Sequence, residues 1–583
     1  MKMKMAGALL PALLAAAAFA AEREYIWPDG MMPDPQPHQI AAMTDVSTAE
    51  GFDPGEWRRP YLEWYAPDPA APRTRSCVIL ISGGGYNNQC DVKPVREWRE
   101  KLTALGVTCV NFVHRTPRPE GLPFYKSAWE DGQRAVRVVR SQAAARGFDP
   151  ERIGTMSMSA GSHLATLLAT SSQTPAYGPV DELDATVPCH VNWACAFSIA
   201  YAMTDGLGCR NTRDGDGVDV ALDDIFKFDE KTAPMCMMHG GNDVYSPGSS
   251  THVYRRLREK GVPAELHLYP DEPHKVLGFD RAVELMRQMG FLGDLAPEEL
   301  LKERFADDGA RGSYEKADVW PEGKMPDVQT NQCVPYIEWH MPKELKTKAV
   351  QIIYSGGSYM SSNPDGFEVA PVRRYLNAKG MAVVTLKYRV PRPLPPLAKH
   401  TTAWQDLQRT IRIVRSEAPK RGLDPDRIGI MGSSAGGHLT LMGATSSKRR
   451  AYGDVNWRKI DALEDVPCNV QWGIAIYPAY ALMDGEDRNN TTGGNADDAR
   501  LVPEFSFDLA TPPMLFVHGD ADGWAAMNSV KAWEQLRRMG IQGELHTLAT
   551  RKHCFQRSAS PGTGSYTYLD RIWEFLSKKG FNR

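Results

Sequence analysis

The sequence predicts two tandem α/β domains, each a mostly parallel β-sheet with helices on both faces. Two observations lead to this prediction. A long part of the chain recurs in the same order, and within each copy short apolar runs alternate with stretches of helical periodicity. With 583 residues, of which 42% are hydrophobic and 24% charged, the chain can form two large cores. Its net charge of −3 provides no basic surface, so we expect no nucleic-acid partner.

Residues 1–21 have the pattern of a cleavable export signal. Lys2 and Lys4 precede an apolar run, and residues 18–20 have the small-x-small pattern at which such signals are cut. The apolar run is shorter than the ~20 residues that a membrane-spanning helix needs. We therefore expect a secreted or periplasmic protein with no membrane contact after cleavage of the signal peptide.

The repeat divides the rest of the chain into two copies of one domain. Trp27–Gly30 recurs as Trp320–Gly323, and Ala128–Asp131 recurs as Ala403–Asp406. Duplicated domains often pack about a pseudo-two-fold axis, so we expect the two lobes to contact each other. The predicted boundaries are 22–293 for the first copy, 294–318 for a linker and 319–583 for the second copy.

Apolar strands lead into small-residue loops at the same place in both copies. Cys77–Ile81 and Val350–Tyr354 are continuous apolar runs, as is typical of buried parallel strands, and a glycine-rich loop follows each of them. Trp129–Ala145 and Trp404–Ala418 have apolar residues at helical spacing. In such folds ligands bind at the carboxyl ends of the parallel strands, so we expect the functional residues on these loops.

A nucleophilic serine is predicted in each copy. Ser434 stands at the centre of a G-x-S-x-G motif between a short strand and a helix, where the sharp turn needs small residues two positions before and after it. Ser159 holds the same place in the first copy, but there Ser157 replaces the first glycine of the motif and adds a Cβ to the turn.

A serine nucleophile also needs a base and an acid that orients the base. In this type of fold they follow in the order Ser, Asp, His. Asp243 and Asp522 each follow a short strand that ends in His-Gly, and His274 and His553 lie 31 residues further along. This constant spacing makes them the preferred acids and bases.

Other repeated polar residues are alternatives or have structural roles. Asp205 and Asp484 also recur at equivalent places and remain rival acids. We expect packed or turn positions for four further histidines, namely His163, His438, His239 and His518. The ten cysteines form no C-x-x-C pair and no cluster with zinc-ligand spacing, so we expect no metal and no cofactor.

Backbone N–H groups are expected to stabilise the oxyanion. Glycines allow the backbone after the early strand to approach the substrate, and the residue after the nucleophile supplies a further N–H group. Ser358 stands in the second copy where the first copy has Gly85, which narrows that pocket. The predicted donors are Gly83, Gly84 and Ala160 in the first copy and Gly356, Gly357 and Ala435 in the second.

These motifs carry a resemblance to a known group of enzymes. The loop Ser82–Tyr86 and the Ser-Ala-Gly-x-His-Leu segments at 159–164 and 434–439 resemble α/β-hydrolase esterases that deacylate plant polysaccharides, in particular the acetyl xylan esterase and feruloyl esterase group. The resemblance implies two cofactor-free α/β-hydrolase domains that remove acetyl or feruloyl groups from a polysaccharide such as xylan. Ser82 and Ser355 depart from the group, which often has proline or histidine there.

Two other functions remain open at this point. A serine exopeptidase of the same fold would use the same three residues, but such enzymes usually add a propeller or cap domain that a copy of this size cannot hold. A glycan-binding protein with one inactive copy is the second alternative, and Ser157 makes the first copy the candidate for inactivity. Turnover of peptide anilides without ester turnover would support the peptidase, and glycan binding without turnover would support the binding protein.

Overall fold

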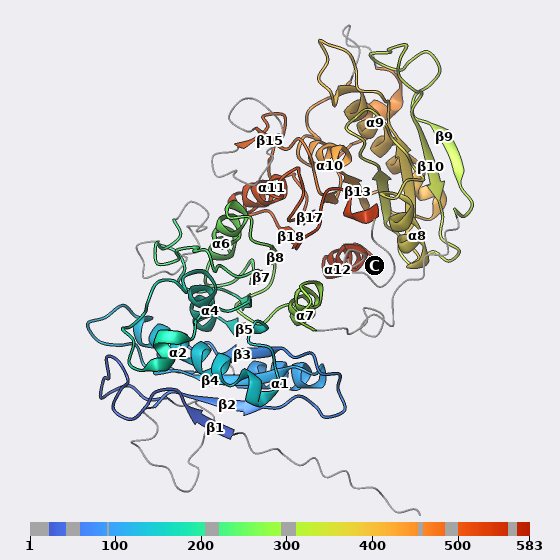
Figure 1. Cartoon of the computed structure of the whole chain (residues 1–583). Helices are drawn as coiled ribbons and strands as arrows, with labels where there is room; N and C mark the ends of the chain where they lie inside the picture. The colour runs from blue at the N-terminus through green and yellow to red at the C-terminus, as the bar shows by residue number, and fades with distance from the viewer. Residues whose placement is uncertain are drawn as a thin grey trace, which may run out of the picture.

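The computed structural model confirms the predicted α/β fold and shows two lobes, each with a twisted sheet between layers of helices (Figure 1). It describes residues 22–41, 59–89, 92–204, 221–292, 311–452, 459–483, 500–557 and 568–583. The predicted signal peptide lies outside the described residues.

The first lobe has a sheet in the order β1-β2-β4-β3-β5-β6-β7-β8. The strands from β4 to β8 in this order are parallel to their neighbours, and β2 pairs antiparallel with both β1 and β4. The strands are β1 (Glu22–Tyr25), β2 (Tyr61–Tyr65), β3 (Cys77–Ile81), β4 (Thr108–Val113), β5 (Ile153–Met158), β6 (Trp193–Phe197), β7 (Met235–Gly240) and β8 (Ala264–Tyr269).

The second lobe repeats this order, with β15 (Leu482–Met483) and β16 (Arg500–Leu501) as a separate short pair. Residues 315–318, which the sequence assigns to the linker, form its edge strand β9, because they pair antiparallel with β10 as β1 pairs with β2. The main strands are β9 (Glu315–Asp318), β10 (Tyr336–His340), β11 (Val350–Tyr354), β12 (Ala382–Lys387), β13 (Ile428–Ser433), β14 (Trp472–Ile476), β17 (Met514–Gly519) and β18 (Gly543–Leu548).

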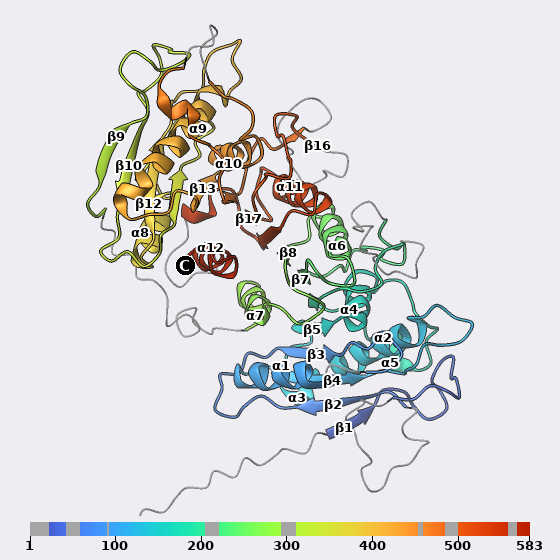
Figure 2. The same ribbon diagram turned by 180° about the vertical axis from the view of Figure 1, so that it is seen from behind.

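Helices cover both faces of each sheet (Figures 1 and 2). Helices α2, α4 and α6 pack on one face of the first sheet and α1 and α7 on the other, and α9, α10 and α11 oppose α8 and α12 in the second lobe. The helices are α1 (Val92–Ala104), α2 (Lys126–Ser141), α3 (Ala143–Arg146), α4 (Ala160–Thr170), α5 (Glu182–Thr186), α6 (Gly248–Glu259), α7 (Phe279–Gln288), α8 (Ala370–Ala378), α9 (Thr401–Glu417), α10 (Ala435–Thr445), α11 (Met527–Arg538) and α12 (Tyr568–Lys578), with 3-10 turns at 418–421, 462–465 and 555–557.

The two sheets join into one sheet of 16 strands. At the centre β8 pairs antiparallel with β18, so that Leu268 lies opposite Leu545 and His267 opposite His546. Each lobe therefore covers a sheet edge that the other lobe would otherwise expose.

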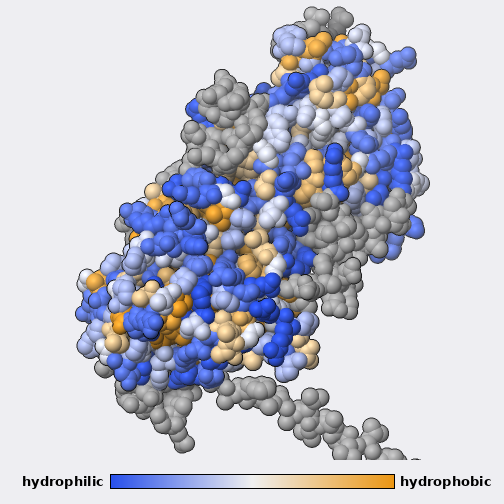
Figure 3. Space-filling model, viewed as in Figure 1, coloured by the Kyte–Doolittle hydropathy of each residue, from blue (hydrophilic) through white to orange (hydrophobic). Residues whose placement is uncertain are grey.

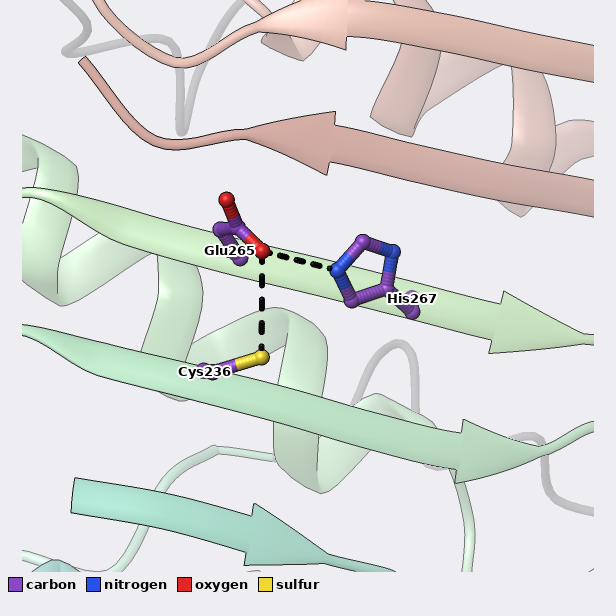
Figure 4. Close-up of side chains that lie close together, drawn as sticks. All are labelled: Cys236, Glu265 and His267. Carbon is purple, nitrogen blue, oxygen red and sulfur yellow. Dashed lines mark hydrogen bonds and ion pairs between the residues drawn. The ribbon is translucent and has the colours of Figure 1, made fainter. Parts of the chain in front are cut away.

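A buried polar network crosses this join, and Figure 4 shows three of its side chains, all from the first lobe. Glu265 accepts hydrogen bonds from the ring of His267, at 3.1 Å, and from the N–H of Ala549 in the other lobe, at 3.0 Å. His267 Nδ1 lies 2.9 Å from His546 Nδ1, and Cys236 Sγ lies 3.9 Å from the Glu265 carboxylate. Cys236, Glu265 and His267 are ligand types, but a structural zinc site takes four ligands and this carboxylate is already hydrogen-bonded, so we interpret the network as fixing the register of the join.

The surface drawn in Figure 3 is mostly hydrophilic, with small and scattered hydrophobic areas. Among the described residues, no helix has the length and apolar character needed to cross a membrane.

Candidate active site

Both predicted nucleophiles stand at a sharp strand-to-helix turn. Ser159 joins β5 to α4 with φ 60°, and Ser434 joins β13 to α10 with φ 55°. Side chains adopt this left-handed region at a cost, and such strain is typical of functional positions. A Cβ on Gly161 would lie only 2.4 Å from the carbonyl oxygen of Ser82, and one on Gly436 only 2.7 Å from that of Ser355, so each turn requires a glycine two residues after the serine.

The structure explains why the first copy tolerates serine at position 157. Ser157 Oγ lies 3.2 Å from Ser162 Oγ and donates to the carbonyl of Cys195 at 3.1 Å. In the second copy a Cβ on Gly432 would lie 2.5 Å from the ring of Tyr354. Position 354 corresponds to Ile81 in the first copy, whose smaller side chain leaves space for the extra atoms.

In the second copy, serine, histidine and aspartate form a continuous chain of hydrogen bonds. His553 Nε2 lies 2.9 Å from Ser434 Oγ, and His553 Nδ1 lies 2.7 Å from Asp522 Oδ2. Burial lowers the pKa of His553, but hydrogen bonds and charge attraction from Asp522 and Cys554 together outweigh it and raise the pKa to about 9. This is the geometry of a nucleophile, its base and the acid that orients the base.

In the first copy the base and the acid are in contact and the nucleophile is not. His274 Nδ1 lies 2.9 Å from both carboxylate oxygens of Asp243. Among the hydrogen bonds between described residues, none joins Ser159 Oγ to His274. Such contacts are often long without substrate. The first site therefore has all three groups, and only the contact between Ser159 and His274 is not formed.

A second histidine supports each acid. His239 Nε2 lies 3.4 Å from Asp243 Oδ2, and His518 Nε2 lies 3.4 Å from Asp522 Oδ2. Burial raises the pKa of both carboxyls, but hydrogen bonds from the two histidines beside each acid outweigh it and hold the pKa below its ordinary value. The expectation that these histidines are turn residues is wrong, because His239 lies in β7 and His518 in β17, where each helps to keep its acid ionised. The rival acids Asp205 and Asp484 lie outside the described residues.

The glycine loop of the second copy lies directly against the nucleophile. A Cβ on Gly356 would lie 2.7 Å from Ser434 Cβ. The Gly356 N–H, however, donates to the buried carboxylate of Glu368 at 2.7 Å, and Glu368 also accepts from Tyr477 Oη at 3.2 Å. Of the three donors predicted for this site, Gly356 is thus engaged by a side chain, which leaves the N–H groups of Gly357 and Ala435 for an oxyanion.

The first copy has the predicted donors Gly83, Gly84 and Ala160 at corresponding positions. Gly84 has φ 118°, and a Cβ there would lie 2.0 Å from the Asn88 carbonyl oxygen, so this turn requires glycine. The counterpart of Glu368 is Asp91, which lies outside the described residues.

A buried tyrosine ties the glycine loop to the helix that follows the nucleophile. His163 Nδ1 lies 2.8 Å from Tyr86 Oη, and His438 Nδ1 lies 2.8 Å from Tyr359 Oη. The prediction that these histidines are packed and hydrogen-bonded is confirmed. No role was predicted for these two tyrosines, although each follows its glycine loop at the same place in both copies.

A row of aromatic side chains, here called the aromatic wall, begins at His274 in the first copy and at His553 in the second. Tyr245 lies against His274, with ring centroids 5.2 Å apart, and its hydroxyl lies 2.9 Å from that of Tyr201. In the second copy Trp524 occupies the place of Tyr245, 6.5 Å from His553 and 4.6 Å from Tyr480. These residues could not be singled out from the sequence, because a lone aromatic after a turn is usually a core residue.

Parts of the chain are similar to known esterases. The chain is 32% identical over 250 residues to an acetylxylan esterase of Xylanibacter ruminicola, with 40% of this chain and 46% of that protein covered. It is 24% identical over 274 residues to the esterase LipQ of Mycobacterium tuberculosis, with 44% and 62% covered. The chain therefore spans roughly half the length of these curated relatives.

Solved structures are also similar to one half of the chain. An acetyl ester-xyloside bifunctional hydrolase from Caldicellulosiruptor lactoaceticus matches with 23% identity and a TM-score of 0.37, covering 46% of this chain and 97% of that one. Esterase 2 of Thermogutta terrifontis matches with 22% identity and a TM-score of 0.36, covering 48% and 98%. The BD-FAE family model matches twice, at residues 62–214 and 337–535, once in each copy. Since these matches take in more than half of the chain, the protein belongs to the BD-FAE family.

Proposed function

We propose that the protein is a serine carboxylic ester hydrolase with two active sites that removes acetyl or feruloyl groups from a polysaccharide such as xylan. The unbroken chain from Ser434 through His553 to Asp522 carries this proposal, because it supplies a nucleophile, a base and an oriented acid beside a glycine loop. The similarity to an acetylxylan esterase supports the choice of substrate.

In the proposed reaction, the three side chains act in sequence. His553 Nε2 takes the proton of Ser434 as Oγ attacks the ester carbonyl, and Asp522 holds the Nδ1–H tautomer and stabilises the imidazolium. The imidazolium then gives its proton to the departing sugar hydroxyl, and an acyl-serine remains. Water, deprotonated by the same imidazole, releases the acid and regenerates the serine.

The first site would perform the same steps with Ser159, His274 and Asp243. For this, the imidazole must come within hydrogen-bond reach of Ser159 Oγ when a substrate is bound. We also propose export to the periplasm or the medium, supported by the pattern of residues 1–21, since a polysaccharide substrate lies outside the cell.

Acetate release from acetylated xylan tests the function. We expect Ser159→Ala and Ser434→Ala each to keep part of the rate, and the double variant to fall by roughly a thousandfold or more, since the nucleophile contributes most of the chemical catalysis. Unchanged unfolding midpoints would show that the variants are folded. Undiminished release by the double variant would refute the proposed nucleophiles.

The same variants separate the alternatives. If Ser434→Ala alone abolishes release, the first copy is inactive towards this ester. If wild type cleaves peptide anilides and no esters, the protein is a peptidase. If it binds xylan without any turnover, it is a binding protein.

A further inference from the structure

The two sites have different walls, although their catalytic groups match. In the first copy the wall consists of His274, Tyr245 and Tyr201, each ring in contact with the next. In the second copy it consists of His553, Trp524 and Tyr480 in the same order. The two copies differ in what packs on that last tyrosine.

In the first copy, aromatic groups and an arginine close the wall. The ring of Phe124 lies 5.4 Å from that of Tyr201, and the guanidinium of Arg118 lies 5.0 Å from the Tyr201 ring and 5.1 Å from the Phe124 ring. Arg118 also donates to the carbonyl of Gly85 at 2.9 Å, so it is fixed between two rings and the glycine loop. The wall of the first site is thus made of two aromatic rings and a guanidinium group whose donor is already bonded to the glycine loop.

In the second copy, an ammonium group takes the place of Phe124. Lys399 aligns with Phe124 because each lies five residues before the tryptophan of a repeated motif. Its Nζ lies 4.1 Å from the centroid of the Tyr480 ring, and it makes no hydrogen bond or ion pair to the described residues. Arg392, the counterpart of Arg118, is exposed.

Two neighbouring positions also carry more polar side chains in the second copy than in the first. Tyr125 and Ile225 of the first copy correspond to His400 and Glu504 of the second. The Glu504 carboxylate lies 3.5 Å from His438 Nε2 and 3.9 Å from His400 Nδ1, so it faces the two histidines. Burial lowers the pKa of Lys399 to about 8 against the attraction of Glu504, and the group is still mainly protonated at pH 7.

We propose that the two sites act on different esters: the second site binds a substrate that carries a carboxylate, which Lys399 holds, and the first site binds an uncharged substrate that packs on Phe124. A half-buried ammonium that makes no hydrogen bond or ion pair to the described residues can bind a carboxylate, and a charge-assisted hydrogen bond there is stronger than a neutral one. An acidic sugar next to the acylated one would supply this carboxylate. The inference rests on the proposed esterase function.

Single-site variants can test this with two probes, acetylated xylo-oligosaccharides with and without a glucuronic acid branch. Ser159→Ala leaves only the second site, and Ser434→Ala leaves only the first. We expect the ratio of kcat/KM for the acidic over the neutral probe to be about tenfold higher in Ser159→Ala, as the loss of one charged hydrogen bond implies.

Exchanging the two residues should exchange the preference. In the Ser159→Ala background, Lys399→Phe should lower the ratio about tenfold while Lys399→Arg retains it. In the Ser434→Ala background, Phe124→Lys should raise it. Lys399→Gln provides the same test if Lys399→Phe does not fold, since it removes the charge and keeps a polar chain.

The outcomes separate this inference from the proposed function. Equal ratios in the two single-site variants, or ratios that Lys399→Phe, Lys399→Gln and Phe124→Lys all leave unchanged, would overturn the inference and leave the esterase intact. No acetate release from either probe by either variant would overturn the proposed function itself.

Discussion

The structure of the turn at Ser434 predicts that Gly432→Ser destabilises the second copy more than the matched substitution Ser157→Gly destabilises the first. In Gly432→Ser, the new Cβ would lie 2.4 Å from the carbonyl oxygen of Gly436 and 2.5 Å from Tyr354 Cε2, both well inside van der Waals contact. Because these neighbours are a helix backbone and a buried ring, relief requires a shift of the turn itself. Forced overpacking of this kind costs about 1–3 kcal/mol, and the shift would also displace Ser434 from His553.

The matched substitution in the first copy should be mild. Ser157→Gly removes two buried hydrogen bonds without creating a clash, for a cost of about 1–2 kcal/mol. A third variant tests the explanation directly: combining Gly432→Ser with Tyr354→Ile installs the residue pair that the first copy has at positions 157 and 81. The double variant should be more stable than the sum of its single effects by at least about 0.5 kcal/mol.

The measurements are chemical unfolding and hydrolysis of 4-nitrophenyl acetate, with Ser159→Ala present so that only the second site contributes. We expect Gly432→Ser to lose most of this activity and Tyr354→Ile to restore part of it. A Gly432→Ser variant as stable and as active as its parent would refute the steric argument. Additive effects of Gly432→Ser and Tyr354→Ile would show that the tyrosine is not the obstacle.

Three further predictions concern the second site, measured with the first site inactivated. Because the folded-state pKa of His553 is raised to about 9 and the base must be neutral, kcat/KM should rise with pH through an apparent pKa above the ordinary ~6.5 of histidine; an apparent pKa at or below 6.5 would contradict this. Glu368→Ala removes the acceptor of the Gly356 N–H and with it one contact that holds the glycine loop in place, so kcat should change with little effect on the unfolding midpoint. An unchanged kcat would show that the loop keeps its conformation without Glu368. Tyr359→Phe should cost about 1 kcal/mol of stability, seen in unfolding, because it leaves buried His438 without this partner; equal stability would show that the tie is dispensable.

The residues of the two proposed sites could be singled out from the sequence because each lies in a short motif whose order and spacing recur. The contact between His553 and Asp522 joins residues 31 positions apart, and the same spacing in the first copy joins His274 to Asp243. The strand pattern likewise predicted the sheet, since buried parallel strands have continuous apolar runs.

Other features depend on contacts that no local pattern encodes. Glu368 is one of many acidic residues in the sequence, and its role appears only when the chain returns to place its carboxylate 2.7 Å from the Gly356 N–H. Phe124 and Lys399 are found only by aligning the copies and seeing which tyrosine each contacts. The join of β8 to β18 depends on edge pairing, and the alternation of residues along a strand does not identify its neighbour.

The join also connects each lobe to the catalytic loop of the other. Arg258 on α6 pairs with Asp520 at 3.1 Å, and Arg537, its counterpart on α11, donates to the carbonyl of Gly241 at 2.7 Å. Gly241 and Asp520 correspond in the two copies, and each lies two residues before the acid of its own site. Each lobe therefore supplies an arginine that holds the loop before the proposed acid of the other lobe. Since the position of the acid sets the orientation of the imidazole, each site depends on the opposite lobe, and the duplicated chain is one structural unit whose two sites differ in their walls.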